Sequence, residues 1–240
     1  MSLSGSQGRR SSCYRILTVR LSPALACLWV LAAAATDAGQ AKLTADALAR
    51  DLQKKYDTVR DFSADFVHVY QGGLLRQKAT ERGHVLIKKP GKMRWEYRSP
   101  EAKLFVSDGR KLYSYIHQDN EVLVTTVPAD DQATTPALFL SGKGNLTRDF
   151  SVSFDTIAEA PAGAVAIKLL PKRREPEYDW LSLAVDPKTL AILVLATVDA
   201  QGGRSTFTFS NLSENVGLSD NEFIFQMPRG VDVVTDAPAH

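Results

Sequence analysis

The chain has 240 residues, of which 44% are hydrophobic and 23% are charged, and this is the composition of an ordinary globular protein. That length suggests one domain, or at most two. The whole chain carries 29 basic and 27 acidic residues, but its first 38 residues hold four of the basic residues and one of the acidic ones. The remaining 25 basic and 26 acidic residues give no reason to expect a nucleic-acid partner.

Residues 1–38 differ from the rest of the chain. Four arginines precede an apolar run, "LSPALACLWVLAAAA" at 21–35, and small residues follow it. This order is typical of a secretory signal peptide, and the run is too short for a confident transmembrane span. We therefore expect residues 1–38 to be removed, with an approximate cleavage site, and residues 39–240 to form a single domain. An uncleaved N-terminal anchor is the alternative.

Both cysteines, Cys13 and Cys27, fall within this leader, so the mature chain would contain no thiol and need no disulfide. The stretch "ALAC" at 24–27 faintly resembles a lipoprotein cleavage box. Against lipidation, alanine stands three residues before the cysteine where leucine is expected, and the apolar run continues past it.

The first element expected in the mature chain is an amphipathic helix over residues 43–59. Its apolar side chains recur at spacings of four, four and three, which places them on one face. Thr44 can cap the first turn, and Asp46 lies near the positive end of the helix dipole. The apolar face comprises Leu48, Leu52, Tyr56 and Val59.

Short strands linked by tight turns are expected after the helix. The patterns predict about eleven strands, without helical crossovers, in one antiparallel sheet that curls toward a barrel. The strand-like runs are residues 62–70, 82–89, 92–98, 102–106, 111–117, 121–127, 150–154, 164–170, 180–186, 191–198, 205–212 and 223–227.

The run at 92–98 has two unlike faces. Three large apolar side chains alternate with four charged ones, and a strand sends successive side chains to opposite faces. The apolar face could be core, a stacking platform for bases, or a wall for a lipid. We expect it to point inward unless a β-bulge shifts the register. The inward residues are Met93, Trp95 and Tyr97, and the outward ones are Lys92, Arg94, Glu96 and Arg98.

A short apolar segment interrupts the strands. Thr135 and Pro136 indicate a helix start, and Gly142 indicates its end. A helix of one or two turns cannot persist alone in water. We therefore expect residues 136–141 to act as a movable plug buried in the open mouth of the sheet.

Sequence motifs for chemistry are absent. None of the four histidines has metal-ligand spacing to another ligand, and there is no nucleophile elbow, phosphate loop or metalloprotease helix. The pair Asp130 and Asp131 is interpreted as a solvated loop. We therefore expect no catalytic residues, no metal and no cofactor, although a catalytic triad is spatial and can escape such a search.

Five stretches in order resemble the LolA family of periplasmic lipoprotein carriers, from about residue 43 to residue 234. They are "FSADFVH" (62–68), "KKPGKMRWEY" (88–97), "VSDGRKLYSY" (106–115), "TPALFLSGKGNL" (135–146) and "FQMPRGVDV" (225–233). The resemblance implies an incomplete antiparallel β-barrel, closed by an N-terminal helix and a short helical lid around an apolar cavity.

The resemblance also implies a function. Such a carrier would be a periplasmic monomer without enzymatic activity that takes acylated lipoproteins from the inner-membrane transporter LolCDE. It would deliver them to the outer-membrane receptor LolB, where one is present.

The same resemblance implies a site. The cavity would bind acyl chains, although ordinary packed core is the alternative for each lining residue. Many family members place arginine before the proline of the "KKPG" turn, where it holds the lid. Here that position is Lys89, with Arg94 as a possible helper, and a solvated surface lysine is the alternative. The expected lining residues are Leu52, Tyr56, Met93, Trp95, Tyr97, Leu138, Phe139 and Leu140.

Other functions stay open at this point. A lipid- or lipoprotein-sensing regulatory module of the cell envelope would need a further domain or anchor. LolB itself would need a lipidated cysteine, which residues 39–240 lack. An esterase acting on lipid would need Ser, His and Asp to converge in space. A nucleic-acid module fits least with the near-zero charge of the mature chain.

Overall fold

The computed structural model describes residues 43–72, 78–127, 140–142, 144–175 and 177–235, and all of them belong to one compact unit, residues 41–240. The part of the chain described contains one 12-stranded sheet and three short helical elements. None of the described helices is long and apolar enough to cross a membrane.

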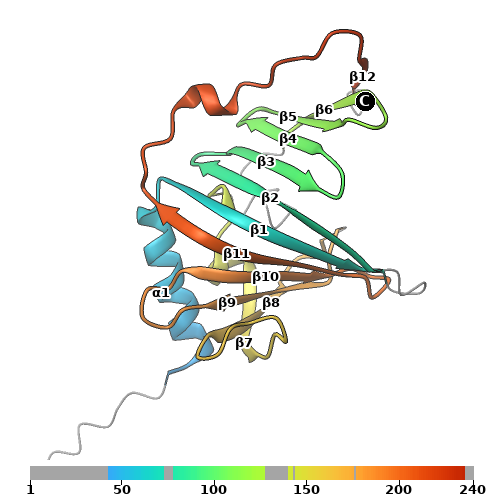
Figure 1. Cartoon of the computed structure of the whole chain (residues 1–240). Helices are drawn as coiled ribbons and strands as arrows, with labels where there is room; N and C mark the ends of the chain where they lie inside the picture. The colour runs from blue at the N-terminus through green and yellow to red at the C-terminus, as the bar shows by residue number, and fades with distance from the viewer. Residues whose placement is uncertain (1–42, 73–77, 128–139, 143, 176, 236–240) are drawn as a thin grey trace, which may run out of the picture. The chain divides into compact units, whose positions relative to one another are not determined.

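The elements follow one another in the order that Figure 1 colours from blue to red. The helical elements are α1 (Ala45–Thr58), α3 (Leu146–Asp149) and the 3₁₀ turn η2 (Asp220–Phe223). The strands are β1 (Asp61–Gln71), β2 (Lys78–Lys88), β3 (Lys92–Ser99), β4 (Lys103–Asp108), β5 (Lys111–Ile116), β6 (Glu121–Thr126), β7 (Phe150–Asp155), β8 (Val165–Pro171), β9 (Trp180–Val185), β10 (Ile192–Val198), β11 (Arg204–Glu214) and β12 (Asp232–Thr235).

The sheet is open, with β12 at one edge and β7 at the other. Its strand order is β12-β6-β5-β4-β3-β2-β1-β11-β10-β9-β8-β7, and every pair is antiparallel except β12 with β6. Near the middle of the sheet β1 pairs with β11, although the two strands are far apart in sequence. The mainly antiparallel, incomplete barrel of about eleven strands expected from the sequence is therefore confirmed. Eleven of the twelve strand-like runs form strands, and the remaining strand of the sheet is β12, which lies after the last of those runs.

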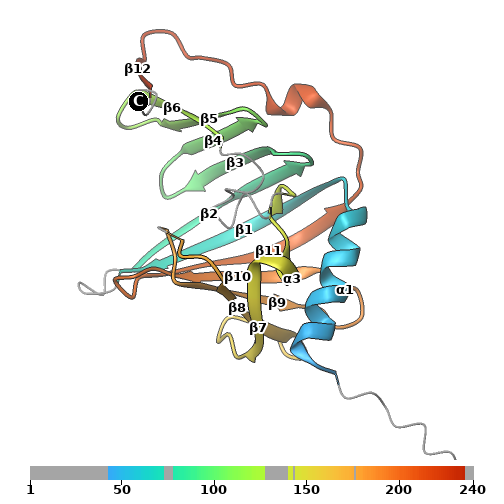
Figure 2. The ribbon, with the colours of Figure 1, turned by 180° about the vertical axis from the view of Figure 1, so that it is seen from behind.

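Helix α1 covers one face of the sheet, which we call the inner face. In Figure 2 this helix and α3 lie in front of the sheet, and the edge strand β7 curls round on the same side. Thr44 caps the helix as predicted, with its hydroxyl accepting from the Ala47 N–H at 3.1 Å. The predicted apolar stripe of the helix is buried in the main core of the protein, because the sheet supplies the apolar surface that the helix needs.

Strand β3 shows the predicted alternation. Met93 and Trp95 are buried on the inner face, and Tyr97 packs against the same core while partly exposed. The charged side chains lie on the opposite, outer face, where Lys92 pairs with Asp220 at 2.9 Å. The β2–β3 pairing does shift register, between Arg82 and Gly83, and the extra residue is Arg98 at the end of β3. The shift therefore lies beyond Met93–Tyr97, whose register with β2 is continuous.

The end of the chain differs from the prediction. Residues 223–227 do not form a strand. They belong to an extended arm, residues 215–235, that runs along the outer face through η2 to β12 (Figure 1). Phe223 is buried beneath this arm, and the Phe225 ring stacks on Tyr113 with centroids 5.0 Å apart. The alternating apolar residues there serve ring packing on the outer face, and backbone pairing begins only at Asp232.

Candidate functional site

An aromatic wall lies at the centre of the inner face. The Phe66 ring of β1 meets the Trp95 and Tyr97 rings of β3 edge to face, with centroids 5.2 and 4.9 Å apart. Phe207 of β11 completes the group, 5.2 Å from Trp95 and 5.9 Å from Phe66. Such ring pairs add to the stabilisation that comes from burial. The wall thus combines side chains from three strands: β1 and β11 pair directly, and β2 lies between β1 and β3.

The structure brings most of the expected cavity residues together. In the described structure they pack against one another in one apolar core, between α1 and the sheet. Tyr97 packs at its margin. Leu138 and Phe139 lie outside the described residues. That the set lines a cavity for acyl chains stays a prediction. The buried members are Leu52, Tyr56, Met93, Trp95 and Leu140, each at most 5% exposed.

Lys89 joins α1 to the segment 140–142. Its ammonium donates to the carbonyl oxygen of Tyr56 in the last turn of α1, where a cation also complements the helix dipole. Its stem fills the space beside Gly142, so closely that a Cβ there would lie 2.8 Å from Lys89 Cδ. Burial lowers the pKa of Lys89, while the nearby carboxylates Asp57 and Glu214 oppose that shift.

The described backbone bond to the 140–142 segment comes from the turn that follows Lys89. The Gly91 N–H donates to the Ser141 carbonyl at 3.0 Å, and the Ser107 hydroxyl donates to the Gly91 carbonyl at 2.8 Å. Arg94 lies elsewhere. It extends from the outer face of β3, where its guanidinium donates to Glu96 at 2.6 Å and to the Glu222 carbonyl at 3.4 Å. The structure therefore brings Lys89, but not Arg94, to this segment.

A polar cluster borders the aromatic wall farther along the strands. His68 lies at its centre, stacked on Phe207 with centroids 4.1 Å apart. Its Nε2 is 2.7 Å from the Ser205 hydroxyl, and its Nδ1 is 3.3 Å from a Glu81 oxygen and 3.4 Å from the Tyr97 hydroxyl. Lys103 donates to the other Glu81 oxygen at 2.6 Å. We refer to these five side chains as the polar cluster.

The cluster changes the acid–base behaviour of its members. Burial lowers the pKa of His68, and the positive charge of Lys103 adds to this effect, while Glu81 opposes it. Burial raises the pKa of the Tyr97 hydroxyl, and the charge of Glu81 raises it further. The phenol therefore remains a neutral donor at physiological pH.

We expect the cluster to make the fold less stable at mildly acidic pH. Because the pKa of His68 is lowered by folding, the unfolded chain takes up the proton first as pH falls through the ordinary histidine value near 6.5. The contribution of His68 to the free energy of unfolding is therefore complete above about pH 6.5 and decreases as the pH is lowered further. Urea midpoints at pH 7.5 and 5.5 should differ less in His68→Gln than in the parent. Ser205→Ala keeps the imidazole and should retain the full difference. An equal difference in all three proteins would contradict this role of His68.

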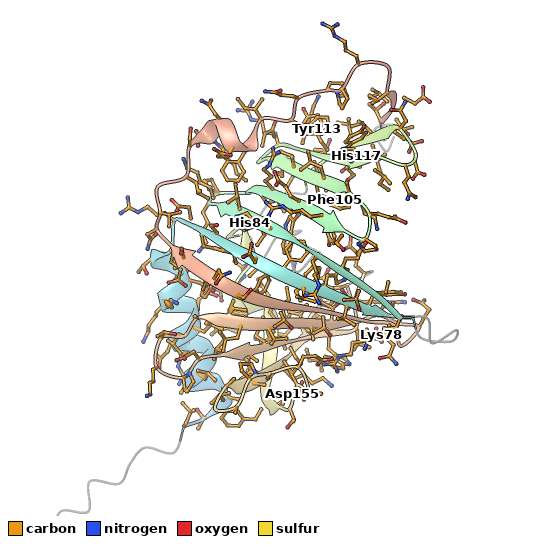
Figure 3. The ribbon with its side chains drawn as sticks, in the orientation of Figure 1. Lys78, His84, Phe105, Tyr113, His117 and Asp155 are labelled. Atoms are coloured by element: carbon orange, nitrogen blue, oxygen red, sulfur yellow. The ribbon has the colours of Figure 1, made fainter. Side chains whose placement is uncertain are left out.

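Two Ser–His–acid chains converge in space, as an esterase would require. One is Ser205–His68–Glu81 in the polar cluster. The other lies on the outer face, where His84 (labelled in Figure 3) is 3.0 Å from the Ser63 hydroxyl and 2.7 Å from Asp65. An acyl-transfer site also needs free N–H donors for the oxyanion. Both serines lie on strands that are paired on both sides, β1 and β11, and the β1–β11 register shifts beside Ser63. In the described structure both chains form hydrogen-bonded links between neighbouring strands.

Two further kinds of site were considered, a metal site and a surface pocket. No group of three or more His, Cys, Asp or Glu residues capable of holding a metal occurs among the residues that the structure describes. A surface pocket of about 380 Å³ opens between α1, α3 and β7, away from the aromatic wall. It is lined by Asp46, Arg50, Thr147, Phe150, Ser151, Val152 and Lys172, a largely polar set.

The sequence prediction missed several members of the site. Phe66 and Phe207 were placed on strands but not assigned to the wall, and the polar cluster was not expected. The signal for Phe207 was present, because "STFTF" at 205–209 alternates as an inward-facing strand does. The cluster had no such signal, because its members come from five different strands.

These features define the class of protein: an open, incomplete β-barrel with an aromatic inner wall beneath an amphipathic helix. The model of the family described as "Outer membrane lipoprotein carrier protein LolA" matches residues 57–226. The chain belongs to this family.

Individual relatives agree with the family match. An outer-membrane lipoprotein carrier protein from Chromohalobacter salexigens is 32% identical over 87% of this chain and 97% of its own length. A protein of the same name from Methylococcus capsulatus is 32% identical over 77% of this chain and 86% of its own. A solved structure of an uncharacterized conserved protein from Thermus thermophilus has a TM-score of 0.50 at 11% identity. It covers 78% of this chain and 98% of its own, and this likeness concerns the fold alone.

Proposed function

We propose that this protein carries lipoproteins across the periplasm by enclosing their acyl chains against the inner face of the sheet. The observation that carries the proposal is the aromatic wall beneath α1 and Leu140, in a chain of the LolA family. The lining residues would be those that the structure packs together in this core. Covalent chemistry has no part in this function, since release and delivery need only binding and a change of partner.

The physical need for such a carrier is large. Each acyl methylene that is kept from water is worth about 0.8 kcal/mol, so several long chains oppose transit through water by tens of kcal/mol. A protein that replaces the membrane as the apolar environment lowers that barrier. It must also release its cargo, which favours a covering element held by few contacts over a permanently closed core.

The partners follow from this role as proposals. Cargo would be acylated lipoproteins, LolCDE would load them, and LolB would receive them where it is present. The leader at residues 1–38 would direct export, which places the mature, monomeric chain in the periplasm. N-terminal sequencing of the exported protein tests the leader: cleavage between about residues 35 and 41 is expected, and an intact N-terminus would contradict it.

The test of the carrier function is recovery of cargo. The mature chain is purified from periplasm, and mass spectrometry is applied to what accompanies it. Triacylated lipoproteins bound in about equimolar amounts are expected. The purified chain should also release newly made lipoproteins from spheroplasts into solution. Protein that is folded but free of lipid, and that releases no lipoprotein, would contradict the proposal.

Lys89 provides a prediction about the covering segment. Lys89→Leu keeps most of the stem beside Gly142 but removes the donor to Tyr56, so the segment 140–142 and the end of α1 should separate more readily. The expected loss is about 1 kcal/mol, or about fivefold in the ratio of closed to open forms. Lys89→Arg keeps the charge and should be tolerated. Equal lipoprotein release by the parent and both variants would show that Lys89 does not hold the segment 140–142 in place.

A further inference from the structure

The indole N–H of Trp95 has no acceptor. Trp95 is 5% exposed, and among the residues that the structure describes its Nε1 is the one buried side-chain nitrogen or oxygen without a hydrogen-bond partner. A buried donor left unpaired costs about 1–3 kcal/mol, and phenylalanine would fill an aromatic core without that cost. The contacts with the Phe66 and Phe207 rings do not satisfy a donor as a carbonyl oxygen does. This donor therefore indicates an acceptor supplied by a ligand.

The position of Trp95 shows what kind of acceptor fits. Inward-facing residues on β3 lie about 7 Å apart along the strand. One step toward the β2–β3 turn is Met93, in the apolar part of the core that Leu52, Tyr56 and Leu140 share. One step in the other direction is Tyr97, whose hydroxyl belongs to the polar cluster. Trp95 thus lies where the inner face changes from apolar to polar.

That change runs along the strands, away from α1. Lys89, at the β2–β3 turn, contacts the end of α1, and β2 runs from there to Lys78, which Figure 3 labels at its far end. Glu81 and Lys103 lie on the inner face between the wall and that far end, paired with each other at 2.6 Å. An amphiphile that follows this gradient would place its chain near α1 and its polar part at the cluster.

An acyl chain joins its polar part through an ester or amide carbonyl. We propose that the Trp95 indole N–H donates to such a carbonyl of the bound acyl chains and so fixes their direction. The hydrocarbon would extend toward Met93, Leu140 and α1, and the glyceryl and peptide part would lie at His68, Glu81 and Lys103. Trp95 is then a specificity-determining residue for acyl over alkyl lipids. The inference rests on the proposed carrier function.

The experiment compares two ligands and two proteins. The ligands are a cysteinyl peptide with a dipalmitoyl-glyceryl group and its dihexadecyl ether analogue, which lacks the ester carbonyls. The proteins are the mature chain and a variant with 3-benzothienylalanine at position 95, in which sulfur replaces the N–H and the ring keeps its shape. Affinities are measured by displacement of a fluorescent fatty-acid probe.

The parent should bind the ester ligand about five- to tenfold more tightly than the ether, which is the usual net worth of one hydrogen bond. The variant should bind both ligands equally and should match the parent on the ether. Equal binding of both ligands by the parent, or the same preference in both proteins, would overturn the role of Trp95 and leave the carrier function standing. Binding of neither ligand by the parent would overturn both.

A second measurement needs no variant. The mature chain contains two tryptophans, Trp95 and Trp180, so its indole N–H resonances number two. Trp180 serves as an internal reference, because it lies on β9 with the Lys168 ammonium 4.2 Å from its ring. The ester ligand should shift the Trp95 N–H signal downfield and slow its hydrogen exchange, and the ether ligand should not. Identical signals with both ligands would overturn the inference even if the variant failed to fold.

Discussion

Gly83→Ala is expected to lower the free energy of unfolding by about 3 kcal/mol or more, which is at the upper end of what overpacking costs. An added Cβ would lie 2.5 Å from Phe66 Cζ and still closer to the carbonyl oxygen of Glu96. The Glu96 carbonyl oxygen belongs to the backbone of the β2–β3 pair, so it cannot move aside without disturbing that pairing. The absence of a side chain at Gly83 is what lets Phe66 lie across β2 and meet Trp95 and Tyr97.

The measurement is thermal and urea unfolding of the mature chain. A loss of this size lowers the melting temperature of a domain of this length by roughly 6–12 °C. Gly163→Ala is the matched control, because nothing lies within 4 Å of its added Cβ and only its φ of +86° opposes the change. The control should cost about 1 kcal/mol. Equal losses for the two variants would show that the packing of Phe66 over Gly83 does not matter.

Gly83 also illustrates what sequence could not predict. In "RGHVLIKK" it reads as a strand residue of low propensity, and its use appears only when Phe66 of another strand crosses it. The pairing of β1 with β11 could not be predicted from the sequence either. It joins Phe62 to Glu214, and no local pattern encodes which strand meets which over that separation. The wall and the polar cluster both depend on this pairing.

Local features, by contrast, were predictable because nearby residues determine them. The spacing of apolar residues and the Thr44 cap define α1 without reference to the sheet. Strict alternation over Lys92–Arg98 defines the two faces of β3, and burial follows it. The same reasoning was wrong at residues 223–227, where alternation arises from rings packed on the outer face rather than from a strand. Alternation of apolar residues indicates which side chains are buried. A strand also requires backbone pairing with a neighbouring strand, which alternation alone does not show.

The second large effect is expected from a substitution in the segment that ends at Gly142. Leu140 is 1% exposed and packs in the core with Leu52 and Tyr56, while the next carbonyl, that of Ser141, accepts from Gly91. Leu138 and Phe139 of the expected plug lie outside the described residues, so Leu140 carries the test. Acyl chains that enter the core must take the volume that this side chain occupies. If acyl chains bind there as proposed, Leu140 and the chains compete, and we predict that the segment is a two-state element biased by the ligand.

Leu140→Glu is expected to shift this element strongly toward the open form. An unpaired carboxylate in the apolar core costs roughly 3–5 kcal/mol, so the segment leaves the core instead.

Binding of a hydrophobic dye to the empty protein should rise several-fold, and the sheet should remain folded because its strand pairing does not include residue 140. Leu140→Gln separates charge from shape: it should bind less dye than Leu140→Glu at pH 7, and the two should converge near pH 4 as the carboxyl is protonated. With lipoprotein bound, all forms should bind equally little dye, since the chains already fill the core. Unchanged dye binding in Leu140→Glu would mean that the segment covers no acyl site. Loss of the whole fold would mean that Leu140 is a structural core residue that does not move aside. Acyl chains would then have no route past Leu140 to Trp95.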